Sequence, residues 1–102
     1  MIALISDRRE AVAALCEQFH VRRLDVFGSA SRGNFMPATS DIDFVVDFEP
    51  LSPVTSWDAY FGLLEGLEAL FDRHIDLIMT DAVVNPYFRE SLDASRECVY
   101  AA

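Results

Sequence analysis

Cysteines, basic residues and long apolar runs are scarce in this chain, and each scarcity excludes a class of protein. The two cysteines, Cys16 and Cys98, lie far apart and form no CxxC pair, so neither a disulfide framework nor a zinc site is supported. Eight basic residues stand against 17 acidic ones, for a formal net charge of -9. A nucleic-acid-binding surface needs clustered Lys and Arg, so direct nucleic-acid binding is not expected. A basic protein partner or bound divalent cations suit this charge better.

No apolar run is long enough for a membrane span. The N-terminal stretch 1–5 meets charged residues at once, which also makes it too short for a signal sequence. No repeat or linker divides the 102 residues, and we expect one cytoplasmic domain, residues 1–102. Hydrophobic residues nevertheless make up 52% of the chain, and the mean hydropathy is +0.19. We therefore expect some apolar surface to face a partner, in a homo- or hetero-oligomer.

Helical and strand patterns alternate along the chain. Period-3.6 patterns and capping residues predict helices over residues 7–20 (behind Ser6), 53–71 and about 85–94. Alternating patterns predict strands over residues 21–27, 41–48, 74–80 and 97–100. This order predicts an α+β (α/β-like) fold, in which the helices pack on one face of a small sheet.

A turn suited to phosphate follows the first expected strand. The run Gly28-Ser29-Ala30-Ser31-Arg32-Gly33 begins with a residue that lets backbone N–H groups approach an anion. Ser29 adds a hydroxyl donor, and a short helical turn here would add its dipole. Arg32 either reaches a phosphate or braces the loop, and the sequence leaves both roles open.

Three carboxylates are placed to share one site. Asp41 and Asp43, preceded by Ser40, lie two apart on the second strand, so both side chains point to the same face about 6.5–7 Å apart. Asp76 is the odd carboxylate in the apolar third strand. Carboxylates in one place repel each other. Two divalent cations bound between them would replace this repulsion with attraction, and so the cluster would bind the cations. Oxygen ligands point to two Mg²⁺ ions, or Mn²⁺, which phosphoryl-transfer sites commonly place about 3.5–4 Å apart.

Other polar candidates have simpler interpretations. His20 and His74 have no ligand spacing with another His or Cys, so we assign both a structural role. Asp25 and Asp47 share strand faces with polar neighbours, and for both we expect solvent or a loop salt bridge.

The expected helix 53–71 carries a broad aromatic stripe. Its helical spacing favours core packing over a partner hot spot for Trp57, Tyr60 and Phe61.

The combined pattern strongly resembles the DNA-polymerase-β-type nucleotidyltransferases. It is most similar to their minimal members, the antitoxin-type MNT proteins that pair with HEPN ribonuclease toxins. The matching motif residues are Gly28, Ser29, Arg32, Gly33, Ser40, Asp41, Asp43 and Asp76. The resemblance implies a mixed sheet with the acidic residues on its open face, and ATP with Mg²⁺ as substrate. For antitoxin members it implies transfer of AMP to a tyrosine of the partner toxin, with Asp41, Asp43 and Asp76 as catalytic metal ligands.

Two other functions stay open. The chain could neutralise its partner by covering it, without catalysis, and the high apolar fraction motivates that alternative. Nucleotidyl transfer to a small molecule would need an acceptor pocket that so short a chain could supply only at an oligomer interface.

Overall fold

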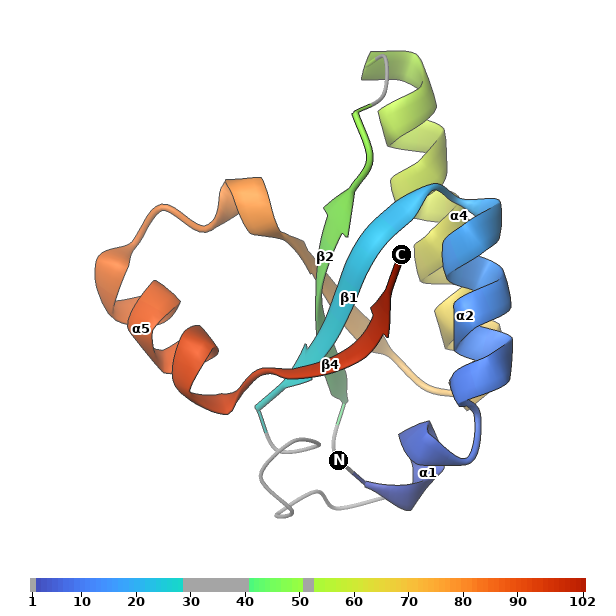
Figure 1. Ribbon diagram of the computed structural model, residues 1–102, viewed down its shortest axis with the longest axis horizontal. Coiled ribbons are helices and arrows are strands. Elements are labelled where there is room, and N and C mark those ends of the chain that lie inside the picture. Colours follow the sequence, from blue (N-terminus) through green and yellow to red (C-terminus); the bar gives the residue numbers. More distant parts are fainter. Residues whose placement is uncertain (1, 29–40, 51–52) are drawn as a thin grey trace.

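The computed structural model describes residues 2–28, 41–50 and 53–102, and these form helices on both sides of a sheet (Figure 1). The helices are α1 (Ala3–Ser6), α2 (Arg9–Gln18), α4 (Pro53–Phe71), the 3-10 helix η1 (Thr80–Ala82) and α5 (Pro86–Ser95). The strands are β1 (Val21–Phe27), β2 (Ile42–Phe48), β3 (Ile75–Met79) and β4 (Glu97–Ala101). Within the described residues the strands form one sheet in the order β3-β2-β1-β4. The β1 strand is antiparallel to β2 and β4, and β2 is parallel to β3, so the predicted mixed α+β fold is confirmed.

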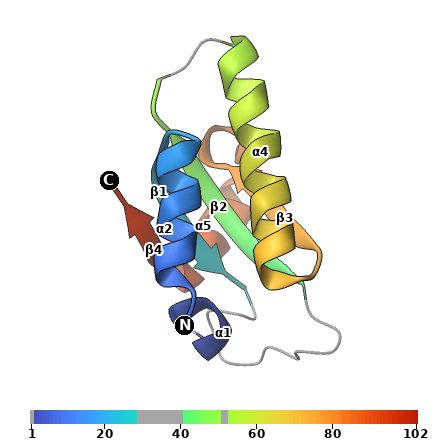
Figure 2. The same cartoon turned by 90° about the vertical axis from the view of Figure 1, so that its right-hand side faces the viewer.

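The two long helices, α2 and α4, lie side by side over one face of the sheet (Figure 2). Between them and the sheet is the main core, which includes the fully buried side chains of Leu24, Phe44 and Leu63. On the opposite face α5 packs Leu92 against Phe27 and Val45. The prediction that the helices pack on one face of the sheet is therefore wrong for α5, because Leu92 gives this helix its own apolar contact with the second face.

The expected helix over residues 7–20 is wrong at its start. The chain forms a separate short helix, α1, which buries Ile5, and α2 begins only at Arg9. Ser6 therefore does not cap α2, and its hydroxyl donates instead to the carbonyl oxygen of Ile2. After α2, His20 adopts a φ of 62°, the left-handed conformation that ends a helix and turns the chain into β1.

Two glycines let α2 and α4 approach closely. A Cβ atom added at Gly66 would lie 2.7 Å from Leu15 Cδ2, and one added at Gly62 would meet the ring of Phe19. Side chains from α2 therefore occupy the space that larger residues on α4 would need.

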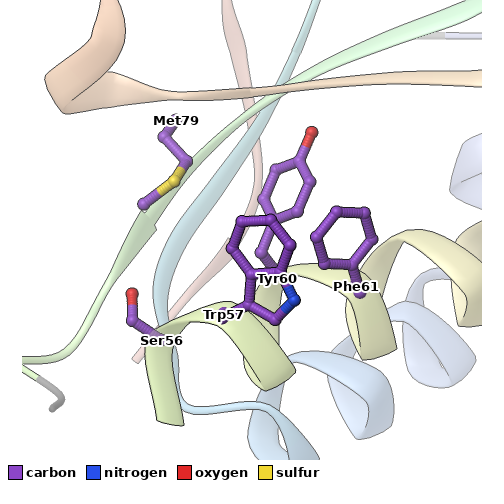
Figure 3. Close-up of a pocket in the computed structure, with 5 residues that line it drawn as sticks. All are labelled: Ser56, Trp57, Tyr60, Phe61 and Met79. Atoms are coloured by element: carbon purple, nitrogen blue, oxygen red, sulfur yellow. The ribbon is translucent and has the colours of Figure 1, made fainter. Parts of the chain in front are cut away.

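The aromatic residues of α4 do not all face the core. Trp57 is 67% exposed and Phe61 39% exposed, so the prediction of core packing is wrong for both. Ala59 and Leu67 are buried from the same helix instead. Tyr60 is half-buried, and its hydroxyl donates to the carbonyl oxygen of Leu77 on β3. The three rings line a shallow hollow opposite Met79 (Figure 3).

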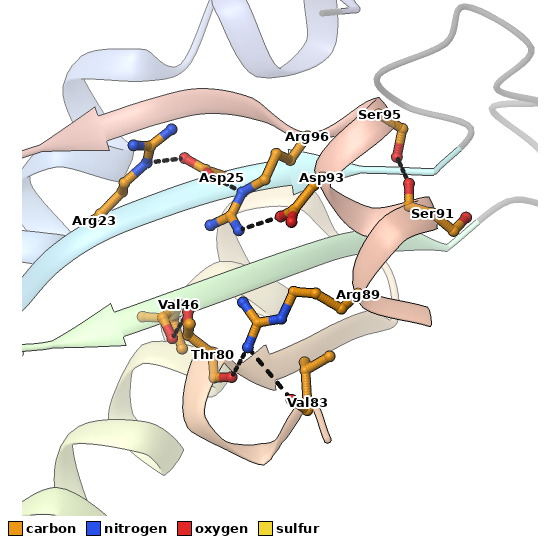
Figure 4. Close-up of polar contacts among 10 residues, drawn as sticks. All are labelled: Arg23, Asp25, Val46, Thr80, Val83, Arg89, Ser91, Asp93, Ser95 and Arg96. Atoms are coloured by element: carbon orange, nitrogen blue, oxygen red, sulfur yellow. Dashed lines mark hydrogen bonds and ion pairs between the residues drawn. The ribbon is translucent and has the colours of Figure 1, made fainter. Parts of the chain in front are cut away.

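A buried ion-pair network ties β1 to the end of α5 (Figure 4). Asp25 is fully buried and accepts hydrogen bonds from Arg23 Nε at 2.9 Å and from Arg96 Nε at 2.6 Å. The expected salt bridge exists, but its carboxylate is fully buried, whereas the Arg23 side chain remains half-exposed. By contrast, Asp47 forms the expected exposed pair, 3.2 Å from Arg22 Nε.

The start of α5 agrees with the sequence. Asn85 Oδ1 accepts hydrogen bonds from the backbone N–H groups of Tyr87 at 2.9 Å and Phe88 at 3.2 Å, and Pro86 opens the helix. The N-cap and the buried network at the other end together hold α5 against the second face of the sheet.

Candidate functional site

Parallel pairing of β2 and β3 places two of the predicted carboxylates directly beside each other. Asp43 is the register partner of Asp76, and Ile42 that of Ile75. Asp41 lies immediately before β2 and is exposed. Since side chains alternate along a strand, Asp43 and Asp76 both point away from the main core, toward the face on which α5 lies. The structure thus brings the predicted acidic residues together.

Gly28 ends β1 next to this group. Its φ is +70°, and an added Cβ would lie 2.7 Å from Asp43 Oδ2. Here the absence of a side chain leaves room for the Asp43 carboxylate beside the backbone. The remaining predicted phosphate-binding residues, Ser29, Arg32, Gly33 and Ser40, lie outside the described residues.

His74 belongs to the same group, which the sequence interpretation missed. Its Nδ1 lies 3.3 Å from Asp41 Oδ2 and 3.7 Å from Asp76 Oδ1. Ligand atoms of Asp41, His74 and Asp76 all lie within 4.8 Å of one another. The signal was available, because His74 and Asp76 are two apart and so fall on one face of an extended chain.

Burial and neighbouring carboxylates disfavour the charged form of Asp43. Burial raises the pKa of Asp43 to about 6, helped by a hydrogen bond with Asp76 and by the negative charges of Asp76 and Asp41. His74 acts in the opposite direction. A cation bound between these groups would remove the repulsion. The carboxylate oxygens of Asp41, Asp43 and Asp76 are the kind of ligand that Mg²⁺ and Mn²⁺ prefer, so these three residues fit the predicted metal.

A cavity of about 520 Å³ opens beside the cluster and passes round the β3 edge of the sheet. Asp43, His74 and Asp76 line its polar part, whereas Phe27 and Phe88 line its apolar part on the second face. Its volume is in the range of small-molecule sites. Tyr60, from α4, lines its far side.

Two observations concern the cysteines and the helices. Both cysteines are free in the structure, and burial raises the pKa of the Cys16 thiol to about 12, which leaves it unreactive. Among the helices of the described segments, none combines the length and apolar character needed to cross a bilayer.

Comparisons with known proteins agree with this geometry. A family profile described as "Nucleotidyltransferase domain" matches residues 8–98. The protein adenylyltransferase MntA of Thermococcus cleftensis is 37% identical over 86 residues, which span 84% of this chain and 80% of that protein. A solved structure of a candidate minimal nucleotidyltransferase has a TM-score of 0.74 at 30% identity, and covers 90% of this chain and 89% of that one.

A more distant likeness comes from a toxin–antitoxin complex. In the complex of the tri-AMPylated Shewanella oneidensis HEPN toxin with its MNT antitoxin, one chain matches with a TM-score of 0.63 at 16% identity. The match covers 96% of this chain and 73% of that one, and at this identity it shows a shared fold. The profile match over most of the chain and the related adenylyltransferase together show that this chain belongs to the nucleotidyltransferase domain family.

Proposed function

We propose that this chain is a single minimal nucleotidyltransferase domain that transfers AMP from ATP to a hydroxyl, a tyrosine, of a HEPN-type toxin, and so acts as an antitoxin. The observation that carries the proposal is the convergence of Asp41, Asp43 and Asp76 next to the Gly28 turn. A related protein is named a protein adenylyltransferase, and a chain of the same fold comes from a complex with an AMPylated HEPN toxin.

Each residue has a distinct part in the proposed reaction. The turn that begins at Gly28 holds the nucleotide phosphates, and Asp41 and Asp43 hold the metal that accompanies them. Mg²⁺ held by these carboxylates would supply positive charge for the phosphates and for the acceptor hydroxyl. The acceptor oxygen forms a bond to the α-phosphorus, the bond from that phosphorus to the bridging oxygen breaks, and pyrophosphate leaves. Asp76, exposed at the cavity, would complete the second metal site, where the acceptor hydroxyl would give up its proton to the Asp76 carboxylate and become the attacking group.

The test is a labelling experiment. The chain is incubated with ATP labelled at the α-phosphate, Mg²⁺ and a purified HEPN-type toxin. We expect label on the HEPN-type protein, and none with Asp43→Asn or in excess EDTA. Asp47→Asn is the matched control, because Asp47 lies on the same strand and forms an exposed pair with Arg22. No transfer by the wild type, or full transfer by Asp43→Asn, would reject the proposal.

Neutralisation by complex formation alone is a second candidate function. It is favoured by the exposure of Trp57 and Phe61, which are typical interface anchors. Growth rescue separates the two functions. If Asp43→Asn still binds the toxin and rescues growth fully, covering the toxin is sufficient; if it binds without rescue, catalysis is required.

A further inference from the structure

An apolar hollow on the surface of α4 is built like a protein-binding site. It is lined by Ser56, Trp57, Tyr60, Phe61 and Met79, has a volume of about 320 Å³, and is here called the aromatic groove (Figure 3). The ring centroids of Trp57 and Phe61 are 4.7 Å apart, and those of Tyr60 and Phe61 are 5.2 Å apart. Exposed aromatic residues held against one another present a large rigid apolar surface at low entropic cost.

The aromatic groove has an acidic rim. Asp58 and Glu65 are exposed on α4, three residues before and four residues after Phe61, so both are its neighbours on the helix surface. Asp81 is exposed two residues beyond Met79, on η1. The chain as a whole carries a net charge of -9. Charge complementarity therefore favours a basic occupant, and it disfavours a second copy of this chain.

The groove also adjoins the candidate active site. Tyr60 lines both the aromatic groove and the cavity that contains Asp43 and Asp76. Its hydroxyl is fixed by donation to the Leu77 carbonyl oxygen, so the ring is held between the two hollows. The charge of Asp76 helps burial to raise the pKa of Tyr60, which agrees with this proximity. A protein bound in the groove would therefore have residues at the acid cluster.

We propose that the aromatic groove is the docking surface for the acceptor protein, which inserts an apolar side chain flanked by Lys or Arg and thereby presents its hydroxyl to Asp76. This inference rests on the proposed function, because it names the surface through which the acceptor reaches that same site. In this proposal α4 binds the acceptor protein, and β2 and β3 carry the catalytic carboxylates. Substitutions can therefore change binding and catalysis separately.

The first experiment measures binding without nucleotide. The dissociation constant for the HEPN-type toxin of the labelling experiment is measured by calorimetry with wild type and with the double variant Trp57→Ala, Phe61→Ala. Buried aromatic anchors each contribute about 30-fold or more in affinity, so we expect binding at least about 30-fold weaker. Val84→Ala is the matched control, because Val84 is 88% exposed and lies outside the groove, and it should bind like the wild type. Unchanged circular dichroism and melting temperature show that the double variant is folded.

A charge-reversal pair tests the rim. Asp58→Lys with Glu65→Lys should slow association and weaken binding about tenfold or more at low salt, and the difference should shrink at high salt. Glu17→Lys, an exposed reversal on α2, is the control and should change binding little. Equal binding by wild type and both groove variants, or no binding by the wild type, overturns the proposal. So does a dimer of this chain, seen by light scattering, that Trp57→Ala with Phe61→Ala dissolves.

Failure of the docking surface and failure of the proposed function give different results. If the groove variants lose binding but the wild type transfers no label, the docking surface stands and the adenylyl transfer falls. If transfer occurs and the groove variants bind and transfer like the wild type, the function stands and the docking surface falls. Asp43→Asn should bind as the wild type does in both cases, because the Asp43 carboxylate lies outside the groove.

Discussion

Removing the charge of Asp43 should stabilise the metal-free fold while it abolishes activity. Asp43 is half-buried between Gly28 and Asp76, and the folded environment raises its pKa from the ordinary 3.8 to about 6. One pKa unit corresponds to about 1.4 kcal/mol, so the full shift corresponds to about 3 kcal/mol. Solvent screening of a half-exposed group reduces this, and we expect a gain of about 1–1.5 kcal/mol for Asp43→Asn at pH 7.

The effect of Asp43→Asn on the free energy of unfolding depends on pH. Because the folded-state pKa is raised, the stability that comes from protonating Asp43 is fully present below its unfolded pKa of 3.8. It is lost as the pH rises through about 6, where the folded carboxyl ionises beside Asp76 and Asp41. Asparagine stays neutral at every pH. The advantage of Asp43→Asn should therefore be largest at pH 7 and above, and should vanish near pH 4.

Thermal unfolding in EDTA measures the difference. For a domain of this size a gain of about 1 kcal/mol raises the melting temperature by about 4–8 °C. Asp47→Asn, which loses only an exposed pair with Arg22, should be neutral or slightly less stable and serves as the control. Saturating Mg²⁺ should reverse the ranking, because ligand at 100 times its dissociation constant stabilises the wild type by about 2.7 kcal/mol. If Asp43→Asn is no more stable than the wild type in EDTA at pH 7, the electrostatic reasoning is refuted.

Three further predictions concern residues that support the acid cluster and α5. Asp25→Ala should cost about 1.5–3 kcal/mol in urea unfolding, because Arg23 and Arg96 lose the buried carboxylate that accepts their hydrogen bonds, and a loss below about 1 kcal/mol would contradict this. Gly28→Ala should reduce the transfer rate at least about tenfold, because the new Cβ meets Asp43 Oδ2 at a φ of +70°; activity within twofold of the wild type would argue against it. Asn85→Ala should lower the free energy of unfolding by about 1 kcal/mol through loss of the α5 cap, whereas Asn85→Ser should retain most of it.

The strands and the acid cluster were predictable because their patterns are local. Alternation of apolar residues gave β1 its observed bounds, Val21–Phe27, and placed Asp41 and Asp43 on the face away from the core. The proximity of Asp76 needed one more step, since only the parallel pairing of β2 and β3 brings it beside Asp43. The roles of these residues as metal ligands stay a prediction.

Residues whose environment depends on tertiary packing were harder to predict. The α4 helix is apolar around much of its circumference, so spacing alone could not decide that Leu63 and Leu67 face the sheet and Trp57 faces solvent. Asp25 can be buried because Arg96, which is distant in the sequence, donates a hydrogen bond to it, and no local sequence pattern predicts such a partner. His74 was dismissed for lack of a second histidine, although its actual neighbours are carboxylates.

The parallel pairing of β2 with β3 also orders events during folding. These strands are separated in the chain by α4, so their contact is non-local and carries a loop-closure cost that a hairpin avoids. A chain emerging from the ribosome acquires the Gly28 turn and both acids near β2 well before Asp76 can join them. The complete acid cluster therefore forms only when this non-local strand pair is in place.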